Sequence, residues 1–91
     1  MASANVSRAA VKQAENLCKA AISELNNSNK KLGNRFREAG QHWKDNKYKQ
    51  LGEIINECQT AMNRPVKELM ECVIKLQEME KAIIAYEETT L

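Results

Sequence analysis

The sequence has few residues that turn or break a chain. It holds three glycines and one proline among 91 residues. A β-sheet protein of this length needs such residues at every reversal between its short strands. The composition therefore excludes a many-stranded sheet and predicts long helices with few connections. We expect an all-α protein with a single helical-hairpin domain over residues 1–91, at the small end of chains that bury a core alone.

Aromatic residues and charge are also scarce. Aromatic residues make up 4% of the chain and the formal net charge is +2, so a polyanionic partner is not implied. The stacked aromatics that bind single-stranded nucleic acids are missing. The chain has one histidine, no phosphate-binding glycine loop and no nucleophile beside a base. We therefore expect no enzyme activity, no cofactor, no metal site and no nucleic-acid partner.

Long apolar runs are absent as well. No stretch approaches the roughly 20 apolar residues that cross a membrane, and the first ten residues lack the apolar segment of a signal peptide. We expect a protein made in the cytoplasm without a membrane span. This expectation leaves open export by a secretion system that recognises folded proteins.

Opposite charges are concentrated in opposite halves of the chain. Residues 1–49 hold ten basic and four acidic residues, and residues 50–91 hold four basic and eight acidic residues. We interpret this as attraction between two antiparallel halves, in which each exposed pair contributes on the order of 0 to 1 kcal/mol. The alternative is a basic tip that binds an anion. Its residues would be Lys30, Lys31, Arg35, Arg37, Lys44, Lys47 and Lys49.

Apolar and small residues recur at alternating steps of three and four in the first half, which predicts a helix over about residues 4–39. Leu25, Leu32 and Phe36 keep this phase across the poor helix formers at residues 26–29 and Gly33, where we expect bending or fraying. The predicted face comprises Val11, Ala14, Cys18, Ala21, Leu25, Ser28, Leu32, Phe36, Ala39 and Trp43.

The second half predicts a helix over about residues 46–88 with the spacing of a heptad seam. A second apolar row beside the seam makes the stripe wider than one facing helix can cover, so we expect a partner. The predicted seam comprises Tyr48, Leu51, Ile55, Cys58, Met62, Pro65, Leu69, Cys72, Leu76, Met79, Ile83 and Tyr86. The row beside it comprises Ile54, Ala61, Val66, Met70, Val73 and Ile84.

Pro65 interrupts this second helix in one of two ways. It removes a backbone donor and crowds the carbonyl of Ala61, at a cost of about 3 kcal/mol or more inside a helix. The helix either kinks at Pro65 or ends near Asn63 and restarts as a third helix. The seam keeps its phase through the proline, which favours the kink.

Residues 40–45 form the predicted turn. Gly40 is placed just past a helix end, where positive φ favours glycine, and Asp45 or Asn46 is placed to cap the next helix. Between them we expect Trp43 to cover both helix ends as an apolar plug and His42 to be solvated. A short turn makes the helices antiparallel. Two such hairpins would then close a four-helix bundle, either as a homodimer or with a different hairpin.

The cysteines are Cys18, Cys58 and Cys72. Cys58 and Cys72 are too far apart to share a metal ion, at about 21 Å along a helix. We expect three small buried thiols in a reduced protein. The alternative is a disulfide between Cys18 and Cys72, which are nearly equidistant from the turn.

Two helices of about 40 residues joined at a turn with a lone tryptophan resemble the WXG-type (ESAT-like) family, over Val6 to Tyr86. Trp43 corresponds to the family's tryptophan, and Asp45 stands where the family has glycine. The family's export signal is an aromatic residue followed four residues later by an acid, whereas Tyr86 is followed there by Thr90.

The resemblance implies small helical hairpins that dimerise into four-helix bundles and take part in type VII secretion. This chain would be a secreted substrate, or a partner or chaperone that binds the helical export domain of a larger toxin. The alternative is a coiled-coil adaptor or scaffold in the cytoplasm with no link to secretion.

Overall fold

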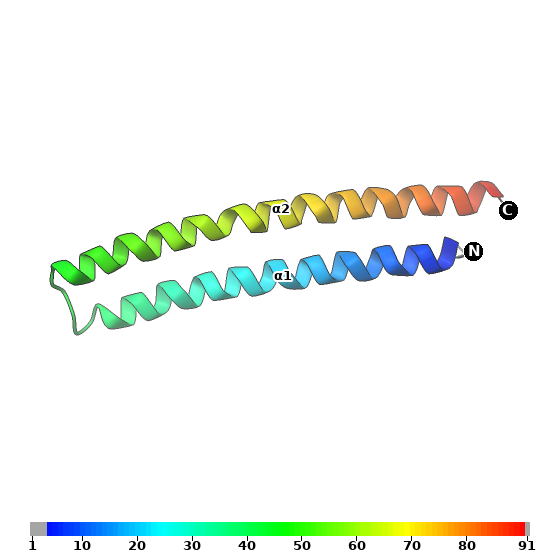
Figure 1. Ribbon diagram of the computed structural model, residues 1–91. Helices are drawn as coiled ribbons and strands as arrows, with labels where there is room; N and C mark the ends of the chain where they lie inside the picture. The colour runs from blue at the N-terminus through cyan, green and yellow to red at the C-terminus, as the bar shows by residue number, and fades with distance from the viewer. Residues whose placement is uncertain (1–3, 91) are drawn as a thin grey trace. The chain divides into compact units, whose positions relative to one another are not determined.

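The computed structural model describes residues 4–90, which form two helices and no strand (Figure 1). α1 spans Ala4–Ala39 and α2 spans Asn46–Thr90. The all-α helical hairpin predicted from the sequence is confirmed. Among the described residues, neither helix combines the length and apolarity required to cross a bilayer.

α2 continues through Pro65 as one helix, so the alternative with a third helix is excluded. Both Pro65 and Ala61 are exposed. Because proline has no amide hydrogen, the carbonyl of Ala61 loses its helical partner, but on this face water can reach it. The helix therefore tolerates the proline on its outer side.

The chain divides into two compact units that each contain part of both helices. The end unit comprises Met1–Ile22 and Glu68–Leu91, and the turn unit comprises Ser23–Lys67. In each unit a segment of α1 runs beside a segment of α2 (Figure 1). Each unit is therefore held together by its own contacts between the two helices.

The inward face of α2 differs in part from the predicted seam. Its buried and half-buried residues alternate at steps of four and three. In the turn unit they are Tyr48, Gly52, Ile55, Gln59, Met62 and Val66. In the end unit they are Leu69, Val73, Leu76, Glu80, Ile83 and Glu87, with Ile84 half-buried at the edge.

Half of the predicted seam occupies this inward face. Tyr48, Ile55, Met62, Leu69, Leu76 and Ile83 lie in it, with Leu51 half-buried at its edge. Val73, which was predicted in the row beside the seam, is the most buried apolar residue of α2. Cys58, Pro65, Cys72, Met79 and Tyr86 are exposed instead, each one residue before an inward position. The prediction followed apolar residues, whereas polar Gln59, Glu80 and Glu87 take three of the inward positions.

The inward face of α1 carries Leu25, Leu32 and Phe36, as the sequence predicts. Asn29 is half-buried and Gly33 is buried, whereas the predicted Ser28 and Ala39 are exposed. α1 continues through residues 26–29 and Gly33 without a break. The polar stretch is therefore part of the contact between the helices rather than an interruption of it.

Two glycines of the turn unit lie where the helices approach closely. A Cβ atom on Gly52 would lie 2.8 Å from the ring of Phe36, and one on Gly33 would lie 2.9 Å from the amide nitrogen of Gln59. Neither distance is compatible with an ordinary van der Waals contact. Glycine therefore permits the contact in both places, although it is a poor helix former.

We expect Gly52→Ala to lower the free energy of unfolding by about 1 to 3 kcal/mol, because the new methyl group overpacks against a fixed ring. Gly33→Ala meets only the end of a flexible side chain. Its gain in helix propensity of about 1 kcal/mol offsets the loss of one hydrogen bond, so stability stays within about 1 kcal/mol of wild type. Urea unfolding followed by circular dichroism compares the two variants. Equal stabilisation by both would contradict the close approach at Gly52.

Candidate interaction surface

Asp45 begins α2 as a helix cap. Its carboxylate oxygen Oδ1 accepts a hydrogen bond from the backbone amide of Tyr48 at 3.0 Å, and its carbonyl accepts the amide of Lys49 at 3.3 Å. This is the N-cap arrangement, in which a side chain satisfies an otherwise unpaired amide. The predicted role of Asp45 is confirmed, and it explains how the turn forms without a glycine at this position.

Tyr48 connects the start of α2 to the end of α1. Its ring stacks on Phe36 with centroids 4.4 Å apart and planes 6° apart. Its hydroxyl donates a hydrogen bond of 2.9 Å to the carbonyl of Phe36, which also accepts the amide of Gly40 at 3.1 Å. Gly40 does not adopt positive φ. Glycine is required there because a Cβ would collide with the Tyr48 hydroxyl.

Trp43 lies outside this cluster and is 39% exposed. Its ring contacts Tyr48 with centroids 5.7 Å apart and planes tilted by 56°. The apolar plug expected of Trp43 is therefore formed mainly by Tyr48 and Phe36. His42 is exposed, as predicted, and so are the seven basic residues assigned to the tip.

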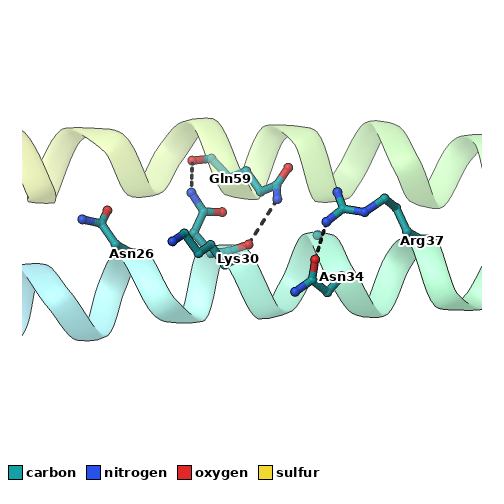
Figure 2. A pocket seen from close by; sticks show the side chains of 7 residues that line it. Asn26, Lys30, Asn34, Arg37 and Gln59 are labelled. Carbon is teal, nitrogen blue, oxygen red and sulfur yellow. Dashed lines mark hydrogen bonds between the residues drawn. The ribbon is translucent and has the colours of Figure 1, made fainter.

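A polar layer crosses the turn unit at Asn29 and Gln59, and Gln59 is labelled in Figure 2. The side-chain amide of each residue donates to the backbone carbonyl of the other, at 3.4 Å from Asn29 and 3.2 Å from Gln59. Such a reciprocal pair is satisfied only when the two residues face each other. It therefore fixes the register of the helices in this unit.

An open groove beside the polar layer has a volume of about 610 Å³. Arg37 donates to Asn34 across one part of it (Figure 2). The groove contains no acid, nucleophile or histidine, and it lacks the apolar walls typical of small-molecule sites. No group of three or more potential metal ligands occurs within residues 4–90. The residues that line the groove are Asn26, Asn29, Lys30, Gly33, Asn34, Arg37 and Gln59.

The end unit contains a buried carboxyl group. Glu15 has no exposed surface. Neither of its oxygens has a donor in the described structure, because the group that it faces is the carboxyl of Glu80. About two turns further toward the helix ends, Arg8 and Glu87 form an ion pair at 3.6 Å.

These two carboxyl groups hold a proton unequally. A shared hydrogen bond with Glu80, then burial and then the charge of Glu80 raise the pKa of Glu15, while Lys12 and Lys19 act against this. The pKa of Glu80 is lowered, chiefly because its carboxyl accepts that hydrogen bond. Two facing carboxylates cannot bond unless one is protonated. The described geometry therefore favours one proton shared by the pair.

The end unit also presents an apolar face on one side. Ala14 and Ala21 directly precede inward residues of α1, and Cys72, Met79 and Tyr86 directly precede inward residues of α2. In an antiparallel helix pair, these positions lie on the same side. Leu17 adds to this side and is 66% exposed, with Met79 at 52% and Tyr86 at 65%. We call these six residues the apolar face.

The turn unit continues this pattern on α2. Ile54, Cys58, Ala61 and Pro65 are exposed at positions equivalent to those of the apolar face. All three cysteines are free, and Cys18 is half-buried. The expectation of three buried thiols is therefore wrong for Cys58 and Cys72, and no disulfide joins Cys18 to Cys72. Their exposure follows from the one-residue difference between the predicted and observed seams.

Comparison with known proteins found no match. No family model matches the chain, no curated protein is similar to it, and no solved structure is similar to it.

We expect Trp43→Ala to lower the free energy of unfolding by only about 1 kcal/mol, because the ring is partly exposed and contributes mainly its contact with Tyr48. A fully buried tryptophan would cost about 3 to 5 kcal/mol. Tyr48→Ala, which removes the stack on Phe36 and a hydrogen bond, should cost more than Trp43→Ala. Chemical unfolding of both variants tests this order, and the reverse order would restore Trp43 as the plug.

Proposed function

We propose that this chain is a non-enzymatic protein-interaction module that pairs with a second helical hairpin to close a four-helix bundle. We further propose that it acts in type VII secretion as a WXG-like substrate, partner or chaperone. The observation that carries the first step is the apolar face, in which the large exposed side chains of Leu17, Met79 and Tyr86 lie on the same side as the small, half-buried Ala14 and Ala21. Small residues let another helix come close, and the large ones supply contact area.

The amount of exposed surface supports a partner. The chain exposes 7240 Å², whereas a folded monomer of its mass exposes about 5,350 Å². The excess is roughly 1,900 Å². Obligate dimers bury about 1,000 to 2,500 Å² on each partner. The excess is therefore of the size that one partner hairpin would cover.

The small core leads to the same conclusion. Among the described residues, the buried apolar side chains are Val11 and Val73, with 8% and 9% of their surfaces exposed. A domain stabilised by hydrophobic burial needs many more such residues, since each contributes about 1.5 to 3 kcal/mol. Pairing through the apolar face would supply the missing burial.

The type VII role is supported by the hairpin and by the tryptophan-containing turn. Asp45 caps α2, so its presence where the family has glycine leaves the turn intact. The cytoplasmic adaptor is the second candidate, and the residue that favours it is Thr90, which replaces the acid of the usual export signal. Both candidates use the same apolar face, so its disruption does not distinguish between them.

Met79→Lys should abolish pairing, because it places an unpaired charge in a buried contact. Ile74→Lys is the matched control, since Ile74 lies on α2 in the same unit, is 55% exposed against 52% for Met79, and faces away from the apolar face. Light scattering on a sizing column should show wild type and Ile74→Lys at twice 10.3 kDa and Met79→Lys at 10.3 kDa.

Circular dichroism of both variants checks that helicity is retained. Equal masses for the two variants would contradict the assignment of the apolar face. A wild-type mass of 10.3 kDa would mean that the apolar face binds a hairpin of a different protein. That protein would then be sought by co-purification from the native host.

Secretion is tested separately by following the tagged protein in culture fluid of the native host, with and without a functional type VII machine. We expect loss of the machine to remove from the fluid either this protein or the larger protein that co-purifies with it. Unchanged amounts of both would favour the cytoplasmic adaptor.

A further inference from the structure

Glu15 stands out because it is a fully buried acid in the seam of a small hairpin. Its side chain has no exposed surface, and neither Oε1 nor Oε2 has a hydrogen-bond donor among the described groups. A buried polar group without a partner costs free energy, and an ionised one costs more. The folded state is therefore more stable when Glu15 is protonated or accepts a hydrogen bond from a donor.

The groups around Glu15 come from both helices. On α1, Lys12 and Lys19 lie within one turn, and both side chains are exposed. On α2, the facing groups are Glu80 and, beside it, Lys81. The positive charge of Arg8 helps to lower the pKa of Glu80, and Arg8 also forms the ion pair with Glu87. The lysines reduce the repulsion between the acids, but no lysine forms an ion pair with Glu15 within the part of the chain that the structure describes.

A shallow groove gives solvent access to the pair through Glu80, which is half-buried. It is lined by Lys12, Gln77, Lys81 and Ile84 together with Glu15 and Glu80. A proton can therefore reach the carboxyls from water without unfolding of the end unit.

We infer that Glu15 and Glu80 form a proton-operated latch, in which one shared proton holds α1 against α2 in the end unit and its loss loosens that unit. The latch acts within one hairpin, so it does not depend on the proposed partner or on secretion. It adds a response to pH that the interaction surface alone does not provide.

The direction of the pH effect follows from the proton balance. The pKa of Glu15 is raised in the folded state, so the folded chain binds more protons than the unfolded chain. This stabilisation is complete below the pKa that glutamate has in the unfolded chain and is lost as pH rises through the folded pKa of Glu15. The pKa of Glu80 is lowered in the folded state, so its contribution to stability is lost as pH falls through that lowered pKa, in more acid solution. Stability should therefore rise as pH falls from neutral through the folded pKa of Glu15.

The experiment measures the melting temperature from pH 5 to pH 8 at one protein concentration, for wild type and for Glu15→Gln. Glutamine carries the donor that protonated Glu15 supplies, at any pH. We expect wild type to melt roughly 4 °C or more higher at pH 5 than at pH 8, the response of a small domain to a modest gain in stability. Glu15→Gln should be nearly flat and should melt above wild type at pH 8.

Glu24→Gln is the matched control, since Glu24 is an exposed glutamate of the same helix. It should keep the wild-type pH profile. A profile of Glu15→Gln parallel to that of wild type, or a lower melting temperature at pH 8, would overturn the latch.

A second measurement does not depend on any variant. Carbon-13 NMR of the glutamate side-chain carboxyls in the wild-type chain should show Glu15 titrating above the other glutamates and Glu80 below them. Midpoints for both residues equal to those of the exposed glutamates would exclude a shared proton.

Discussion

The contact between α1 and α2 depends on polar residues inside its seam. Asn29 and Gln59 bond reciprocally across the turn unit, and Glu15 faces Glu80 in the end unit. The hydrogen bonds of Asn29 with Gln59, and a proton shared by Glu15 and Glu80, both require the two residues to face each other, so each unit has one register. Apolar residues of similar size would pack in several registers, whereas buried polar pairs select one. The choice of inward residues also decides which apolar residues are left outside.

The helices and the turn could be predicted from the sequence because local signals agree there. The three-four spacing, Gly40 after α1 and Asp45 before α2 all indicate the same boundaries, and α1 and α2 follow them. Continuity at Pro65 also followed from the unbroken phase of the residues around it. These are properties of a single helix, which a sequence displays directly.

The side of α2 that faces α1 could not be predicted from apolarity alone. α2 has two apolar rows one residue apart, and choosing the more apolar row placed Cys58, Cys72 and Met79 inside. The structure selects the row that contains Gln59 and Glu80, because their partners lie on α1 at matching positions. Asn29 and Gln59 lie at similar distances from the turn, so their pairing could have served as a signal. Glu15 and Glu80 lie at unequal distances from the turn, so their pairing could not be found in this way. The role of Trp43 was overestimated for a similar reason, since the stacking of Phe36 on Tyr48 is a tertiary contact.

The reactivity of the cysteines can report whether a partner is bound. Cys58 and Cys72 are exposed on the side of α2 that would meet a partner, whereas Cys18 is half-buried between the helices. The rate at which an alkylating reagent labels the first two thiols depends on whether that side is covered. The half-buried thiol provides an internal reference for loosening of the hairpin itself. Occupancy of the surface can therefore be followed in unmodified protein, without a fluorescent label or a tag near the helix ends.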